Sequence, residues 1–175
     1  MDREELPFNR AQRTWVARAA KRIDSTVAFG STKPLNRPGD IFFLNGAFPP
    51  TTEEIQAHTP EPIIFGAASV ANPYIAPSLF NISAMSYGAL SGPAISALSQ
   101  GAYQSGIWLN TGEGGLSPFH RQAPCDLVFQ IGTANYGVRD EQGGLDVAKL
   151  TELAAIPEIK MFEIKLSQGA KPGKG

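Results

Sequence analysis

Four short segments of the chain join an apolar run to glycines and carry one or two polar side chains at the junction. In an α/β barrel the carboxyl ends of the strands face one shared site, so polar groups placed there can act together. A tight turn with a solvated side chain explains any single junction of this kind, whereas four in succession indicate a site. The junctions are residues 84–88 (AMSYG), 110–115 (NTGEGG), 130–132 (QIG) and 165–169 (KLSQG).

The residue types at these junctions suit a flat, redox-active ring. Glycines let a backbone approach such a ring closely. Gln130 can donate to and accept from an imide edge, and Lys165 offers a fixed positive charge. A cation of this kind could stabilise the negative charge that a reduced flavin develops near its pyrimidine edge. These residue types and their spacing are compatible with a flavin.

Hydrophobic periodicity predicts the elements that must position these junctions. Apolar and polar residues alternate along the last of them, which is typical of a strand with one apolar and one polar face. Ser91 is expected to cap a helix that runs to about residue 105, with Pro93 in its first turn. A second helix is expected near residues 146–155. Strands are expected at residues 81–86, 107–112, 126–132 and 160–167.

Strands that alternate with helical crossovers predict parallel pairing. Polar strand ends in such a sheet then indicate the carboxyl face of an α/β barrel. Residues 1–80 lack this regular alternation of strand and helix patterns and contain many prolines. One helix is expected there near residues 9–23, and Thr51-x-x-Glu54 predicts the start of a short second one. The basic residues of the first helix are interpreted as a solvated face.

Composition excludes several classes of function. The 175 residues include 15 basic and 16 acidic ones, so the net charge of -1 favours no nucleic-acid partner. No apolar run approaches the roughly 20 residues of a membrane span, and the N-terminus lacks the apolar core of a signal peptide. We therefore expect a cytoplasmic protein without a membrane span. A lone Cys125 and two histidines, His58 and His120, predict no metal site.

Several segments closely resemble the FMN-binding synthase domain of glutamate synthases, and especially the stand-alone members without a glutaminase domain. They are NISAMSYGALSGPAISAL, NTGEGGLSPFH, DLVFQIGTANYGVR and MFEIKLSQGAKPGKG, with RIDSTVAFGS and NPYIAPSLFNISAMS in the lead-in. The resemblance implies a (β/α)8 TIM barrel that holds FMN at the carboxyl ends of its strands. It also implies the reaction: reduced FMN gives a hydride to 2-iminoglutarate, formed from 2-oxoglutarate and ammonia, and the product is L-glutamate.

The resemblance also implies roles for individual residues. Glu113 matches the acid near the place where ammonia arrives, and Lys171 matches the lysine that binds 2-oxoglutarate. Lys165 would face the N1/O2 edge of the flavin. The cofactor-binding residues implied are Met85, Ser86, Thr111, Gln130 and Lys165.

A complete barrel of this kind needs about 250 residues, and only about four strands fit after residue 80. Residues 1–80 are therefore expected to be an N-terminal extension that packs on the barrel, and residues 81–175 the first half of a truncated barrel. On its own this piece is expected to be inactive, because the FMN phosphate site usually follows the seventh and eighth strands. Any iron-sulfur cluster would need residues beyond this chain.

Two alternatives and two questions about partners stay open. The chain begins Met1-Asp2 and not with a catalytic cysteine, so the source of ammonia or another amine donor is open. The electron donor, a protein or a reductase, is open as well. A related FMN enzyme, such as an N-methylglutamate synthase, would use the same barrel. The other alternative is a fragment without flavin that has only a structural or interaction role.

Overall fold

The computed structural model describes residues 8–21, 23, 38–39, 41, 46–58 and 61–169. The chain divides into two compact units, Met1–Thr51 and Thr52–Gly175, and each is described by itself. The sequence predicted a different kind of boundary, after residue 80, between an N-terminal extension and a half-barrel. That boundary separates the parts by their expected roles, and it stays a prediction. In the part of the chain that is described, no helix is long and apolar enough to cross a membrane.

The first unit contains helix α1, Arg10–Ala20, within the range predicted from the sequence. Asn9 caps it, because its Oδ1 accepts from the backbone N–H of Gln12 at 2.9 Å. The Gln12 side chain accepts in return from the backbone N–H of Asn9, which completes a capping box. Helix α2, Thr52–Ala57, opens the second unit where the Thr51-x-x-Glu54 pattern predicted a helix.

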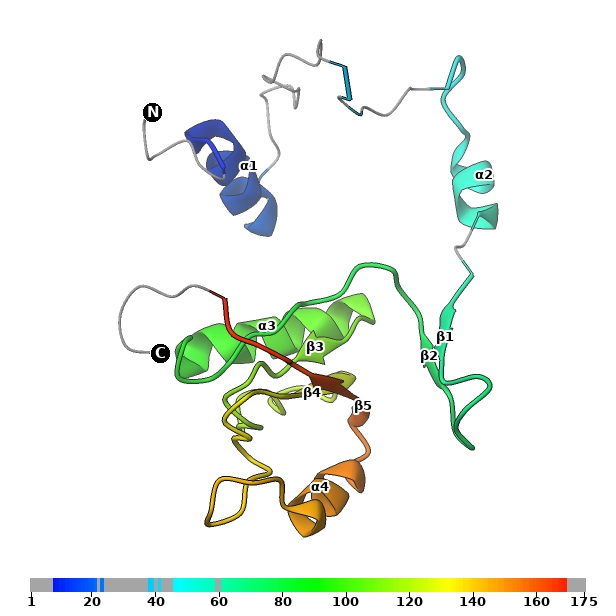
Figure 1. Cartoon of the computed structure of the whole chain (residues 1–175). Coiled ribbons are helices and arrows are strands. Elements are labelled where there is room, and N and C mark those ends of the chain that lie inside the picture. The colour runs from blue at the N-terminus through cyan, green and yellow to red at the C-terminus, as the bar shows by residue number, and fades with distance from the viewer. Residues whose placement is uncertain are drawn as a thin grey trace. The chain divides into compact units, whose positions relative to one another are not determined.

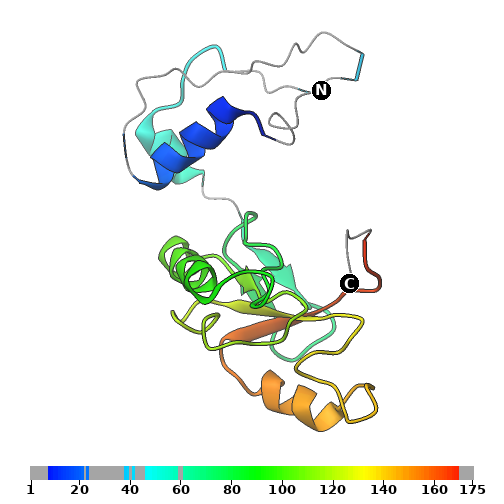
Figure 2. The same cartoon turned by 90° about the vertical axis from the view of Figure 1, so that its left-hand side faces the viewer.

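Three strands of the second unit form a parallel sheet in chain order. They are β3 (Leu109–Asn110), β4 (Leu127–Ile131) and β5 (Ile159–Ile164), and Figures 1 and 2 both show β4 and β5 side by side. Ile82 adds a parallel bridge to Leu109 on the outer side of β3. The predicted parallel pairing is confirmed, although the first predicted strand is reduced to this one bridge. Within residues 61–169 the sheet is open, so the barrel stays a prediction.

The two crossover helices also lie where the sequence predicted them. Helix α3, Gly92–Ser105, has Ser91 as its N-cap and proline in its first turn, and Gly106 ends it at a φ of 63°. Glycine suits this position because the left-handed conformation is strained for other residues. Helix α4, Val147–Ala154, is capped by Asp146, whose side chain accepts from two backbone N–H groups of the first turn.

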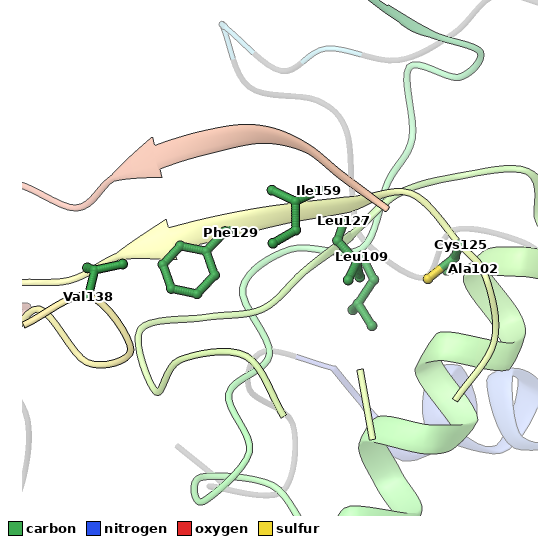
Figure 3. Packing of buried hydrophobic residues seen from close by; sticks show 7 residues of the cluster. All are labelled: Ala102, Leu109, Cys125, Leu127, Phe129, Val138 and Ile159. Carbon is green, nitrogen blue, oxygen red and sulfur yellow. The ribbon is translucent and has the colours of Figure 1, made fainter. Parts of the chain in front are cut away.

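The apolar core lies on one face of the parallel sheet. Leu127 and Phe129 are two residues apart on β4, so both side chains point to the same face. Leu98 of α3 and Leu150 of α4 pack against the same cluster, so both helices cover that face. The opposite face carries the apolar pair Val128 and Met161 and then, nearer the carboxyl ends of the strands, the polar pair Gln130 and Glu163. Figure 3 shows the buried cluster, which consists of Ala102, Leu109, Cys125, Leu127, Phe129, Val138 and Ile159.

An antiparallel pair that the sequence reading missed lies at the amino ends of the sheet. It consists of β1 (Ile63–Phe65) and β2 (Tyr74–Ala76). The rings of Phe65 and Tyr74 both contact Trp108, which directly precedes β3. The Tyr74 hydroxyl donates to Asp126 Oδ2 at 2.9 Å, just before β4. Burial and this hydrogen bond raise the pKa of Tyr74, so the phenol stays neutral. The ring contacts and the hydrogen bond attach the pair β1–β2 to the amino ends of β3 and β4, opposite the predicted site.

Replacing Phe129 by alanine should test the position of the core. Its side chain is fully buried, and we expect a loss of about 3–5 kcal/mol in the free energy of unfolding. Phe162 is the matched control, because its ring contacts Phe129 from β5 yet is 37% exposed. Its alanine variant should lose only about 1–2 kcal/mol. Urea unfolding measures both, and equal losses would contradict the assigned core face.

Candidate functional site

Side chains from three strand-end segments meet at the carboxyl edge of the parallel sheet. Lys165 Nζ lies 3.2 Å from Glu113 Oε2 and donates to Gln168 Oε1 at 3.0 Å. Gln168 Nε2 donates to Glu113 Oε2 and, at 3.2 Å, to Thr133 Oγ1. We call these four residues the strand-end cluster. It ties together the segments that follow β3, β4 and β5.

Glycines allow the loop after β3 to reach the cluster. Gly112 has a φ of +66°, and a Cβ atom on it would lie 2.6 Å from the backbone nitrogen of Ser86. A Cβ atom on Gly132 would lie 2.6 Å from the Cβ of Glu113. Both distances are below any that real side chains show, so larger residues would displace the loop. The glycines at these two junctions are therefore required to place Glu113.

Buried polar groups fix the strand ends behind the cluster. Thr111 is fully buried, and its Oγ1 donates to the carbonyl of Gly112 and accepts from the backbone N–H of Gln130 at 3.2 Å. Asn110 Oδ1 accepts from the N–H of Gly112 at 2.9 Å. The Asn110 carbonyl accepts from the N–H of Met85 at 3.1 Å. Thr111 and Asn110 thus connect the ends of the first predicted strand, β3 and β4.

Gln130 and Glu163 occupy paired positions on the polar face of the sheet. They are partners in the parallel register of β4 and β5, and Gln130 Nε2 donates to Glu163 Oε1. Gln130 is nearly buried, with 6% of its surface exposed. Lys165 follows Glu163 by two residues, so its side chain belongs to the same face. The cluster and the Gln130 amide therefore border one polar surface.

The sequence reading placed several of these residues at this end of the sheet. Glu113, Gln130 and Lys165 lie there as expected, and Glu113 and Lys165 contact each other. Met85 and Ser86 adjoin the same loop through Asn110 and Gly112. Lys171 lies outside the described residues. The roles assigned to all of these residues stay predictions.

Sequence reasoning passed over Thr133 and Gln168 of the cluster, and over Glu163. Thr133 and Gln168 stand just beyond the carboxyl end of a strand, the criterion that selected the other candidates. Glu163 was read only as part of the polar face of its strand. The partner of its carboxylate depends on the register of β5 against β4, which the sequence does not reveal.

A buried histidine lies next to these strand ends. His120 Nδ1 accepts from the backbone N–H of Ser117 at 3.1 Å, so the proton belongs on Nε2. Nε2 then donates to the carbonyl of Met85 at 2.8 Å. Burial lowers the pKa of His120, while the hydrogen bond to Met85 acts in the opposite direction. The imidazole is therefore neutral near pH 7.

Comparison with known proteins identifies the family. The family model described as "Conserved region in glutamate synthase" matches residues 47–175, which is more than half of the chain. The chain belongs to the glutamate synthase family. The resemblance given by the sequence motifs is thereby confirmed.

Curated members of the glutamate synthase family match over very different lengths. The glutamate synthase large subunit-like protein YerD of Bacillus subtilis is 30% identical over 99% of this chain and 40% of its own length. A glutamate synthase large subunit-like protein of Rhizobium meliloti is 34% identical over 65% of this chain and 23% of its own. The archaeal glutamate synthase [NADPH] of Archaeoglobus fulgidus is 40% identical over 53% and 16%.

This member of the family thus spans at most about two fifths of the length of these three relatives. No solved structure gives a significant match.

The donor groups on the polar face are of the types that the polar edge of a flavin would require. The ammonium of Lys165 and the amide of Gln130 supply a cation and a group that both donates and accepts. Thr111 differs, because both contacts of its hydroxyl are made inside the strand ends. Its direct effect in this structure is to hold the backbone of Gln130.

Replacing Gly132 by alanine should displace Glu113 from the strand-end cluster. The added methyl group meets the Cβ of Glu113, so we expect a loss of about 1–3 kcal/mol in the free energy of unfolding. Gly101 is the control, because it lies inside α3 with nothing within 4 Å of an added Cβ. Its alanine variant should be neutral or up to about 1 kcal/mol more stable. Urea unfolding of both variants tests this, and a Gly132→Ala protein as stable as wild type would contradict the close approach.

The pKa of His120 predicts how stability depends on pH. The folded-state pKa is lowered from 6.5, so the unfolded chain binds more protons as the solution is acidified. This contribution to stability is complete above the unfolded pKa and is lost as pH falls through the folded pKa. Unfolding free energies measured from about pH 7.5 to about pH 5 should fall, and less steeply in His120→Gln. Identical slopes for the two proteins would contradict a buried neutral imidazole.

Proposed function

We propose that this chain forms the first part of an FMN-dependent glutamate synthase site on a (β/α)8 barrel. The contact of Glu113, Lys165 and Gln168 at the carboxyl edge is the observation that carries the proposal. A barrel enzyme places its reacting groups at this edge. The chain-order parallel strands, the helices on one face and the polar groups on the other support the barrel.

The reaction proposed is the reductive amination of 2-oxoglutarate. Ammonia adds to the keto carbon, a C=N bond forms and water leaves; the imine then takes up a hydride and a proton to give L-glutamate. Bound FMN, once reduced by an electron donor, would supply the hydride. The name of the Archaeoglobus relative includes NADPH, so NADPH is the first electron donor to test.

Two residues of the polar face would hold the flavin. The Gln130 amide can pair with the imide edge of the ring, since an amide both donates and accepts. The ammonium of Lys165 provides positive charge beside the developing negative charge of the reduced ring. In the structure these groups face Glu163 and Glu113 respectively, so their side chains are already oriented by neighbours.

Glu113 is the residue proposed to move protons. Its Oε2 atom contacts the Lys165 ammonium and accepts from the Gln168 amide, which fixes the carboxylate at the edge of the sheet. Imine formation and reduction both require proton transfers, and a positioned carboxylate can serve as general acid and base. Lys171, assigned from the family resemblance, would pair with a carboxylate of 2-oxoglutarate through a charge-assisted bond.

Replacing Glu113 by glutamine in the intact protein tests the proposed function. We expect glutamate formation to slow by about 10²- to 10⁴-fold while bound flavin is retained. Glu158→Gln is the matched control, because Glu158 pairs with Arg121 at the other end of β5. The two carboxylates are 24% and 25% exposed. The control should stay within about twofold of wild type, and equal rates for the two variants would contradict the role of Glu113.

The two lysines should separate flavin binding from substrate binding. Lys165→Ala should disturb the flavin itself, seen as lost or shifted flavin absorbance. Lys171→Ala should leave the flavin content intact and raise the apparent 2-oxoglutarate constant by roughly one to two orders of magnitude, because a hydrogen bond to a charged group is lost. Flavin titration and steady-state rates measure both effects. Equal flavin loss from both variants, or an unchanged 2-oxoglutarate dependence in Lys171→Ala, would refute the division.

A further inference from the structure

His120 is a fully buried titratable group that the proposed chemistry does not use. It belongs to the turn that follows the loop of Glu113, and its ring reaches back 35 residues to the carbonyl of Met85. The backbone N–H of Ser117 determines the tautomer. It can only donate, so Nδ1 must be the unprotonated acceptor and the ring proton lies on Nε2. The Ser117 hydroxyl also lies 2.9 Å from Nδ1. The imidazole therefore presents its Nε2–H to the Met85 carbonyl, and the backbone of Thr111 is a second hydrogen-bond partner of the ring.

The turn that carries His120 is itself held by α3. Ser99 Oγ donates to the His120 carbonyl at 2.9 Å and accepts from the N–H of Ala123 at 3.0 Å. The neighbouring Phe119 packs against Gly92, where an added Cβ atom would lie only 2.7 Å from the Phe119 ring. Contacts on both sides of His120 thus fix its backbone, and the ring extends from a rigid support.

A short series of contacts leads from the imidazole to the strand-end cluster. The N–H of Met85 donates to the Asn110 carbonyl at 3.1 Å, and Asn110 Oδ1 accepts from the N–H of Gly112 at 2.9 Å. Gly112 also lies directly against Ser86. Glu113 is the next residue. The backbone of Met85 is therefore held at its carbonyl by His120 and at its N–H by Asn110, which leads into the loop that presents Glu113.

We propose that His120 is a positioning residue of the amination site, which acts through its Nε2–H bond to the Met85 carbonyl. The bond fixes the end of the first predicted strand, and through Asn110 and Gly112 it fixes the placement of Glu113. This inference rests on the proposed function for its catalytic consequence. A displacement of about 1 Å at a reacting group can cost about 10²-fold in rate, so a residue without substrate contact can still affect turnover.

Three variants of the intact protein separate the two sides of the ring. Asparagine at position 120 reaches the position of Nδ1 only, whereas glutamine reaches that of Nε2 and can still donate to Met85. We expect His120→Asn to lower kcat by roughly 10- to 100-fold, with flavin content and the KM for 2-oxoglutarate nearly unchanged. His120→Gln should recover most of kcat. Ser117→Ala should behave as wild type, because the backbone N–H of residue 117 still meets Nδ1.

Amide hydrogen exchange gives a readout that does not need turnover. Loss of the bond should speed exchange at Met85 and Gly112 in His120→Asn, and His120→Gln should restore protection. If the wild-type protein makes no glutamate and this exchange pattern still appears, the proposed function is wrong, but the bond from His120 Nε2 to the Met85 carbonyl still holds the strand end. If wild type makes glutamate while His120→Asn matches it in kcat and exchange, the positioning role is refuted.

A third measurement covers the case in which His120→Asn does not fold. Nitrogen-15 NMR of the wild-type histidines reports which ring nitrogen carries the proton. A neutral His120 with the proton on Nε2 supports the proposal. A proton on Nδ1, or a charged ring at pH 7, would overturn it.

Discussion

The parallel register of β3, β4 and β5 is the constraint on which the rest of the site depends. It sets Gln130 beside Glu163 and lets the backbone N–H of Lys165 donate to the Ile131 carbonyl at 2.9 Å. Side chains alternate along a strand, so a slip of one residue would turn Lys165 to the helix-covered face. Phe162 of β5 opposes such a slip, because the slip would turn its ring away from the buried Phe129. The core therefore specifies the polar site on the opposite face.

Two glycines at the strand ends are also needed to place Glu113 in the site. Strand pairing alone brings the carboxyl ends together, but the loop after β3 must still cross the end of the first predicted strand. It does so because Gly112 and Gly132 lack side chains where Ser86 and Glu113 come close. Glu113 can then reach Lys165, which directly follows β5.

Local patterns predicted the elements whose determinants are local. The helix that begins at Ser91 was predictable from its cap and proline, and the alternation along residues 160–167 gave the strand β5. The strands β1 and β2 were missed, since each has three residues and their aromatic rings contact Trp108 much further along the chain. The contact of His120 was missed for the same reason, since its partner Met85 is 35 residues away. Barrel closure and the role of Lys171 stay predictions.

The central claim is that Glu113 and Lys165, brought together by the sheet, act as one unit. A double-mutant cycle tests it most directly, with Glu113→Gln, Lys165→Met and the double variant of the intact protein compared in a single turnover at saturating FMN. Residues in contact show coupling of about 0.5–3 kcal/mol, so the double variant should be much less impaired than the sum of the single effects. Strictly additive effects would mean that the two side chains work independently, and would contradict the account.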